Sequence, residues 1–259
     1  MTRAATGYVI PGTSWLHRRH PLTKLLGVLF VLVAAFLLPP MALVPLALGL
    51  IAVAVSAGLA RPLLRSLQIP AVLIASILVV NALFYPGGSE TLASLGPLTV
   101  TREGLTFGMV AAARLLVVFV SLMLALFTTP ADDLLEGLVA RGVSHRIAFV
   151  VLAAVQLVPR MQDRAERVRA AQAARGLKVD GSIGVRARAL IPLAGPVVLS
   201  ALVNVRERTL ALEARGFGAR PDRTAYRLVA DSDLDRVLRP LLLLATGLVI
   251  VVAIVGAVR

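Results

Sequence analysis

Long apolar runs separated by short polar breaks dominate the first half of the chain. The break between the first two runs is Pro39-Pro40, a pair that cannot continue a helix and favours a tight turn. The first run is shorter than the roughly 20 residues that a helix needs to cross a bilayer, but the aliphatic stem of Lys24 allows an inward extension. We predict four membrane helices, at about residues 25–38, 41–59, 69–85 and 104–128.

The pattern changes after residue 130, where charged positions become frequent. Residues 131–236 contain seventeen Lys or Arg and twelve Asp or Glu, together with apolar stretches at residues 147–158 and 189–205. The first stretch is well below spanning length, and two prolines and a glycine interrupt the second. We predict that both belong to long, kinked helices outside the bilayer, at about residues 146–175 and 187–215. At about 1.5 Å per residue each helix approaches about 45 Å.

A final apolar run at residues 238–258 predicts a fifth membrane helix. The composition agrees, because the 259 residues are 58% hydrophobic and only 16% charged, with a mean hydropathy of +0.86. The predicted fold class is all-α, a polytopic membrane protein with about five transmembrane helices and a cytoplasmic region of long helices. Its predicted parts are an N-terminal segment (1–23), a four-helix membrane region (24–128), the long-helix region (129–236) and the last membrane helix (237–259).

The distribution of basic residues predicts the orientation, because cytoplasmic loops are enriched in Lys and Arg. The first 24 residues carry four Lys or Arg and no Asp or Glu. The loop before residue 104 carries Arg102 against Glu90 and Glu103, and therefore fits the outer side. We predict a multi-pass protein of the cell (inner) membrane, with the N-terminus in the cytoplasm and the C-terminus outside. The N-terminal segment lacks the apolar core of a signal peptide.

The formal net charge of +13 raises the question of nucleic-acid binding. The basic residues instead follow membrane sidedness, and aromatic residues, which stack on bases, make up only 5% of the chain. We therefore expect the lipid bilayer, and no nucleic acid, as a partner.

The chain lacks the residues of an enzyme. It has no cysteine, and the acids of its membrane part are confined to the outer loop, which excludes an intramembrane carboxylate pair. His17, His20 and His145 lack the spacing of a zinc site. No Gly-x-x-x-x-Gly-Lys-Ser/Thr loop occurs, so any ATP is bound by partner subunits. We predict a non-catalytic chain without catalytic residues, cofactor or metal site.

The tripeptide Ala-Arg-Gly ends both predicted long helices, as Ala174-Arg175-Gly176 and as Ala214-Arg215-Gly216. Glycine supplies the left-handed position that ends a helix, so each arginine should project from a last turn. A third copy, Ala140-Arg141-Gly142, lacks the long helix. A single copy is explained by capping, because a cation favours the negative end of the helix dipole. Two copies in one cationic region indicate partner-binding sites, where a guanidinium can bind a carboxylate with both prongs.

Arg114 is a charged residue near mid-depth of the fourth predicted span. A charge there costs at least a few kcal/mol, so it usually faces a partner or water. Asn81 and Tyr85 on the third span are candidate partners. We favour a structural tie between helices over a role in transport.

Three stretches together resemble one known family. Residues 14–25 read Ser-Trp-Leu-His-Arg-Arg-His-Pro-Leu-Thr-Lys-Leu and resemble the pattern Ser-x-Leu-His-Arg-Leu-Asp-Pro-Arg-x-Lys-Leu, with His20 where Asp is usual. Residues 128–134, Thr-Thr-Pro-Ala-Asp-Asp-Leu, resemble the entry into a cytoplasmic coupling region. The third stretch is the pair of Ala-Arg-Gly ends, preceded by Gln172 and Glu213. On these motifs the chain resembles, over nearly its whole length, the transmembrane T component of energy-coupling factor (ECF) transporters, the cobalt, biotin and general vitamin-uptake permease family.

This resemblance implies a coupling subunit of an ECF-type ABC importer. The long helices would act as coupling helices, each docking its Ala-Arg-Gly end into one of two ABC ATPase subunits. The membrane part and the upper surface of these helices would hold an integral-membrane S component that binds a vitamin or a transition-metal ion. The alternative is the permease subunit of a conventional ABC importer, which presents a single Glu-Ala-Ala…Gly coupling loop, so two long helices speak against it.

Overall fold

The computed structural model describes residues 9–86, 90–95, 98–176, 183–217 and 231–258. The chain divides into two compact units. Unit 1 comprises Met1–Gly137 and Val229–Arg259, and unit 2 comprises Leu138–Leu228.

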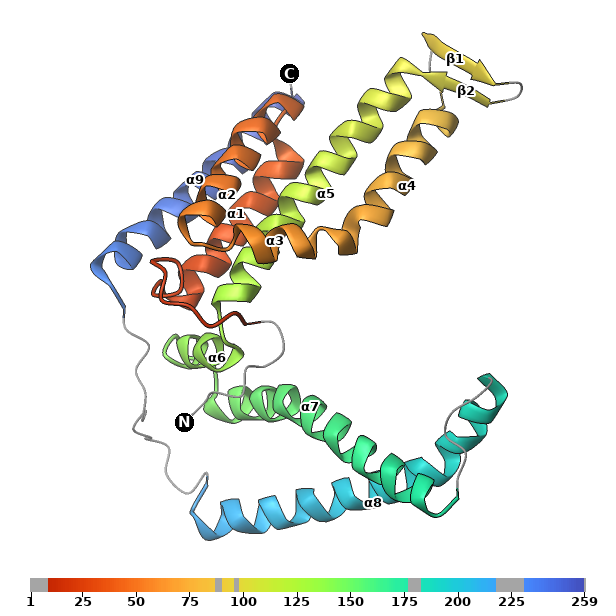
Figure 1. The fold of residues 1–259 in the computed structure, drawn as a ribbon. Coiled ribbons are helices and arrows are strands. Elements are labelled where there is room, and N and C mark those ends of the chain that lie inside the picture. The colour runs from red at the N-terminus through yellow and green to blue at the C-terminus, as the bar shows by residue number, and fades with distance from the viewer. Residues whose placement is uncertain (1–8, 87–89, 96–97, 177–182, 218–230, 259) are drawn as a thin grey trace. The chain divides into compact units, whose positions relative to one another are not determined.

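Unit 1 is a helical bundle (Figure 1). Helix α1 begins where the sequence supplies a start signal: Pro21 occupies its first turn, and the His20 ring accepts a hydrogen bond from the backbone N–H of Leu22 at 3.2 Å. It ends just before the Pro39-Pro40 break. The helices are α1 (Pro21–Leu37), η1 (Pro40–Ala42), α2 (Leu43–Ser56), α3 (Ala60–Ser66), α4 (Gln68–Phe84), α5 (Arg102–Thr128), α6 (Ala131–Val139) and α9 (Asp233–Val258).

The membrane helices differ in length. Among the described residues, α5 and α9 are each long and apolar enough to cross a membrane alone. Helices α3 and α4 meet at an angle of 51° and together can form a third span, whereas α1 and the η1–α2 segment are shorter apolar helices. The five predicted apolar segments are thus all helical, and the number that crosses the bilayer stays a prediction.

The loop predicted between the third and fourth spans contains a β-hairpin. Strand β1 (Thr91–Leu95) pairs antiparallel with β2 (Leu98–Thr101). Thr101 then caps α5, because its hydroxyl accepts a hydrogen bond from the Gly104 N–H at 3.2 Å. The all-α fold class is confirmed for the rest of the described chain, and this short hairpin was missed.

Helix α5 is the centre of unit 1. Its C-terminal half packs against α1, α2 and α3 through Val117, Val120 and Leu124. Its N-terminal half packs so closely on α4 that a Cβ at Gly104 would collide with the Asn81 carbonyl oxygen. Gly108, one turn further along, would bring a Cβ to 3.2 Å from that of Asn81. Small residues at such crossings are typical of membrane helices.

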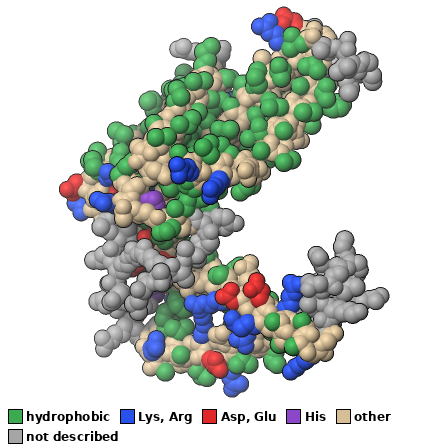
Figure 2. All heavy atoms as spheres, in the orientation of Figure 1, with side chains coloured by type: hydrophobic (Ala, Val, Ile, Leu, Met, Phe, Trp, Pro, Cys, Tyr) green, Lys and Arg blue, Asp and Glu red, His purple; other side chains and the backbone are tan. Residues whose placement is uncertain are grey.

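The surface of unit 1 matches a hydrocarbon environment. Figure 2 shows hydrophobic side chains over much of its visible face, with Lys, Arg, Asp and Glu gathered towards its ends. Large apolar side chains are strongly exposed on three different helices, for example Val72 (79%), Leu48 (61%) and Leu244 (73%). Soluble proteins rarely expose apolar patches of this extent, so lipid or another membrane protein covers them.

Unit 2 consists of the two predicted long helices, α7 (His145–Ala174) and α8 (Ile183–Ala214). Their ends lie within one or two residues of the prediction, except that α8 begins four residues earlier. Pro192 and Pro196 lie inside α8 rather than breaking it. Each proline removes one backbone donor, and Figure 1 shows α8 bent along its length. The interpretation of kinked, continuous helices is confirmed.

Candidate functional site

The second Ala-Arg-Gly end closes α8 with a complete Schellman motif. Gly216 adopts the left-handed conformation, with φ of 70°. Its N–H donates to the Glu213 carbonyl at 2.9 Å, and the N–H of Phe217 donates to the Leu212 carbonyl at 2.9 Å. Backbone N–H groups therefore satisfy the Leu212 and Glu213 carbonyls, and the Arg215 side chain is not needed to cap them.

The first end has the same local geometry where it is described. Gly176 has φ of 89°, and its N–H donates to the Ala173 carbonyl at 2.9 Å. Arg175 occupies the C-cap of α7. The third copy is also closed in this way: Gly142 has φ of 97°, and the Gly142 and Val143 N–H groups donate to carbonyls of α6 at 3.0 and 3.2 Å. The predicted role of the glycines is confirmed, and the cap alone does not distinguish the three arginines.

Both long-helix ends are open to a partner. Ala174, Arg175 and Gly176 are exposed, and so are Ala214, Arg215 and Gly216. Within the described residues, neither the Arg175 nor the Arg215 side chain forms a hydrogen bond or an ion pair. The small alanine before each arginine leaves the adjoining backbone accessible. Two uncompensated cations are thus presented at helix ends.

The two arginines lie at opposite ends of unit 2. The start of α7 contacts the end of α8, because the Phe149 ring lies 4.7 Å from that of Phe217 and the His145 ring lies 6.1 Å from it. Arg215 is therefore beside the first turns of α7, whereas Arg175 follows the last. Helix α7 has 30 residues, a length of about 45 Å, which separates the two sites widely.

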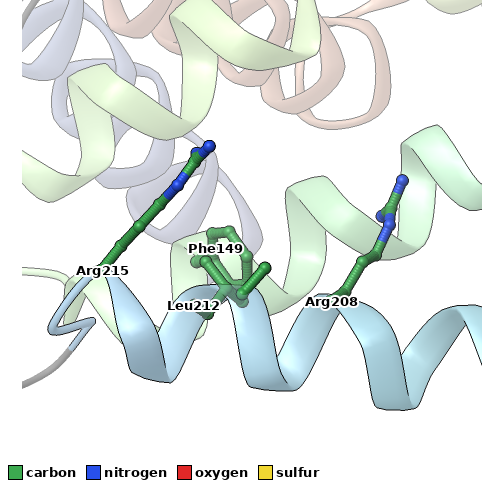
Figure 3. Close-up of a pocket in the computed structure, with 5 residues that line it drawn as sticks. Phe149, Arg208, Leu212 and Arg215 are labelled. Carbon is green, nitrogen blue, oxygen red and sulfur yellow. The ribbon is translucent and has the colours of Figure 1, made fainter.

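Arg215 borders a shallow hollow of about 230 Å³ whose other lining residues are Phe149, Arg208, Ala211 and Leu212. Figure 3 shows Arg208 and Arg215 extending to the same side of α8, with Phe149 and Leu212 between them. Residues seven apart share one helix face, which explains the parallel arginines. Neither Arg208 nor Phe149 was predicted from the sequence. The seven-residue spacing from Arg215 was a signal for Arg208, but nothing in the sequence pairs Phe149 with α8.

Unit 2 also exposes many apolar side chains for a region so rich in charge. On α7 they include Ile147 (60%) and Val150 (64%), and on α8 Leu199 (65%) and Leu202 (63%). These positions come from the two apolar stretches that are too short or too interrupted to span a bilayer. They are available to pack against a hydrophobic partner.

A second polar cluster, also missed from the sequence, joins the start of α9 to the start of α1 in unit 1. Asp235 is fully buried and accepts hydrogen bonds from the Ser232 hydroxyl at 2.6 Å and the His20 N–H at 3.3 Å. Arg239 donates to the Thr23 hydroxyl at 3.1 Å and to both oxygens of Asp231 at 2.6 and 3.1 Å. The cluster fixes the last membrane helix to the first.

His20 takes part in this cluster at the position where the family pattern has Asp. Its side chain caps α1 through its Nδ1 atom, as an aspartate side chain also can. Its ring also touches α6, because a Cβ at Gly137 would lie 3.0 Å from the ring carbon Cε1. The departure from the pattern is thus accommodated locally.

Arg114 and Asn81 do not bond to each other. The Asn81 amide donates to the Ile77 carbonyl at 2.8 Å, and the Tyr85 ring makes a tilted contact with the Phe107 ring, with centroids 5.3 Å apart. Arg114 instead lies over the Phe36 ring of α1, 5.9 Å from its centroid. The reason is helical phase: Asn81 packs on Gly108, and six further residues turn Arg114 by about 240° around α5. The expected tie to α4 is replaced by a contact with α1.

Among the described residues, no three His, Cys, Asp or Glu are grouped to hold a metal ion. The arrangement therefore presents binding surfaces made of cationic helix ends and apolar faces.

Comparison with known proteins agrees with this description. Residues 12–226 match the family model CbiQ, cobalt transport protein. The energy-coupling factor transporter transmembrane protein EcfT of Heliobacterium modesticaldum is 32% identical over 88% of this chain and 90% of its own length. The EcfT proteins of Listeria innocua (31%, 88% and 90%) and Thermosediminibacter oceani (27%, 99% and 98%) are similar over comparable shares. The chain therefore belongs to the cobalt transport protein (CbiQ) family and is an ECF transporter T component of the membrane.

Proposed function

We propose that this chain transmits ATP-driven movement of two ABC ATPase subunits to an integral-membrane S component, for uptake of a vitamin or a transition-metal ion. The observation that carries the proposal is the pair of exposed, unpaired arginines, Arg175 and Arg215, at opposite ends of two long helices. One arginine-bearing end serves each ATPase subunit.

The chemistry of each end suits a groove lined by acids. A guanidinium binds a carboxylate through two parallel hydrogen bonds, which adds geometric specificity to charge attraction. Because backbone hydrogen bonds already close both helices, the arginines bind a partner without loss of the cap. The relatives are named as parts of energy-coupling factor transporters, which supports a multisubunit complex.

The exposed apolar faces of α7 and α8 supply a surface for the S component. A displacement at either arginine moves a helix of 30 or 32 residues, and packed helices pass such movements on by shifting between discrete arrangements. The ATPase closes on ATP, the coupling helices move, and the S component reorients in the membrane. The nucleotide is held by the ATPase subunits, so this chain needs no cofactor.

The second candidate is the permease subunit of a conventional ABC importer. It needs one coupling loop, whereas two matching arginine ends are present here. Co-purification of a small integral-membrane binding subunit distinguishes the two candidates, because a conventional permease has no such partner.

The docking proposal is tested with charge reversals in the complete complex. We expect Arg175→Glu and Arg215→Glu each to lower recovery of the ATPases about tenfold, and the double variant to lower it further. Arg141→Glu is the matched control, since Arg141 is exposed and precedes a glycine with the same cap geometry but follows a helix of only nine residues. Full ATPase recovery with the double variant would contradict the proposal.

A further inference from the structure

Arg114 lies near the middle of α5, and the proposed function gives it no role. It is 12 residues from Arg102 and 14 from Thr128, which correspond to roughly 18 and 21 Å along the helix. Polar groups mark both ends: Arg102 pairs with Glu90 at 2.9 Å, and Lys24 donates to the Thr128 carbonyl at 2.7 Å. The guanidinium is therefore deep in the hydrocarbon layer, which is about 30 Å thick.

Among the described residues, no carboxylate pairs with Arg114. Of the fourteen acidic residues of the chain, twelve lie in residues 131–236, and the others are Glu90 and Glu103 beside the β-hairpin. The Arg114 Nε atom is buried and has no hydrogen-bond partner among the described residues. A single aromatic ring compensates a desolvated cation only in part. Within the part of the chain that the structure describes, the charge is thus left without a counterion.

The uncompensated charge lies at the surface of unit 1. The Phe36 ring beneath it is 60% exposed, and α1 ends at the next residue, Leu37. The neighbouring exposed side chains of α1, such as Leu32 and Leu37, are apolar. Lipid phosphates lie beyond the hydrocarbon boundary, roughly 15 Å from the bilayer centre, so an arginine at mid-depth does not reach them without thinning the bilayer. A second membrane helix can bring an acid to this depth.

We propose that Arg114 and Phe36 form an attachment point for a membrane helix of the S component, whose side-chain carboxylate binds the guanidinium with both oxygens. The proposal rests on the function proposed above, which supplies the membrane partner. Before binding, an acid in an apolar helix and an arginine on an apolar surface each lack a counterion. When the two subunits associate, each charge becomes the counterion of the other. The two-pronged geometry also fixes the register of the two helices.

Co-purification of the complete complex through a tag on this chain tests the attachment. We expect Arg114→Ala to lower recovery of the membrane subunit about tenfold, with ATPase recovery unchanged, because the acid of the partner is left unpaired. Arg114→Lys keeps the positive charge but loses the planar guanidinium that binds both carboxylate oxygens. This variant should recover an intermediate amount of the membrane subunit. Arg102→Ala is the matched control, since this arginine is on the same helix in an exposed ion pair, and it should retain the wild-type amount.

A cross-linking test leaves Arg114 intact. The chain has no cysteine, so Phe36→Cys introduces a single thiol beside the guanidinium. A membrane-permeable thiol-to-amine or photoactivated cross-linker should join it to the membrane subunit. Leu244→Cys on α9, a position that is 73% exposed, is the control and should not form this product.

The outcomes separate this inference from the proposed function. If the membrane subunit co-purifies with the wild type and also in full with Arg114→Ala, the attachment point is wrong and the function stands. If no membrane subunit co-purifies with the wild type, both are wrong. A Phe36→Cys product between two copies of this chain, or loss of a bound anionic lipid alone in Arg114→Ala, would assign the site to that partner and overturn the inference.

Discussion

Single arginines play three different roles in this molecule, and their surroundings decide which. Arg215 is exposed and without a partner among the described residues, Arg239 is buried in a hydrogen-bonded pair, and Arg114 is at mid-depth over an aromatic ring. Arg114 and Arg215 were singled out from the sequence, by depth in an apolar run and by position at a helix end. The role of Arg239 was not predictable from the sequence. One partner, Thr23, is 216 residues away in the chain, and the other, Asp231, precedes α9 by two residues.

Arg239 gives the prediction at this scale. Its side chain is 7% exposed, and replacing it by Gln leaves Asp231 without its bidentate partner. We expect a loss of about 1–2 kcal/mol in the free energy of unfolding, because the Thr23 hydroxyl also loses its donor, whereas Asp231, whose side chain is 35% exposed, is partly hydrated once Arg239 is gone. Thermal unfolding of the detergent-solubilised chain measures the change.

Arg236→Gln is the matched control for this loss. Arg236 pairs with Asp233 at 3.6 Å, but both side chains are largely exposed, at 67% and 99%. Water and salt screen such a pair, so its removal should cost well under 1 kcal/mol. Equal losses in the two variants would contradict the role assigned to the cluster at the start of α9.

The helices of this protein were predictable because an apolar segment in a bilayer has few possible backbone conformations. An apolar run of spanning length must satisfy its backbone hydrogen bonds internally, which fixes α5 and α9 from the sequence alone. The break between α3 and α4 and the β-hairpin were missed. Both depend on short segments, where local preferences are weak and packing against α5 decides the conformation.

The positions of Arg175 and Arg215 at helix ends were predictable in the same way, but the packing around Arg215 was not. The Gly176 and Gly216 caps follow from local sequence. The contact of Phe149 with Phe217 joins residues 68 positions apart, and no periodicity within one helix reveals which residue of another helix lies against it. The helix ends were therefore predictable from this sequence, whereas the contacts between helices were not.

Phe149→Ala provides the prediction for the paired elements. Removing this ring takes away an aromatic contact and part of the apolar packing at the end of α8. We expect amide hydrogen exchange of residues 211–217 to become about 5- to 30-fold faster, corresponding to about 1–2 kcal/mol of lost local stability. Phe107→Ala removes a comparable aromatic contact, with Tyr85 in unit 1, and should leave exchange in residues 211–217 unchanged.

At the scale of the whole molecule, the orientation of the chain in the membrane follows from its charges. The hairpin end of α5 carries one arginine and two glutamates, whereas the region after α5 carries most of the basic residues. We propose that the hairpin and the C-terminus face outward and that the N-terminus and α6 face the cytoplasm. The coupling helices then meet the ATPases on the side where ATP is present.

Single cysteines in the cysteine-free chain measure this orientation. A membrane-impermeant thiol reagent should label Glu90→Cys on intact cells, because Glu90 is exposed beside the β-hairpin. It should label Arg141→Cys, which is also exposed, only after the cells are permeabilised. The reverse pattern would contradict both the orientation and the docking of ATPases at Arg175 and Arg215.

The closed Schellman motif at the end of α8 has one more consequence. The backbone hydrogen bonds that close this helix do not involve the guanidinium. The charge of residue 215 can therefore be changed without redesigning the helix that carries it. Under the docking proposed above, exchanging the charges of Arg215 and of the ATPase acids that it binds would give a transporter that does not assemble with the native ATPases of the same cell.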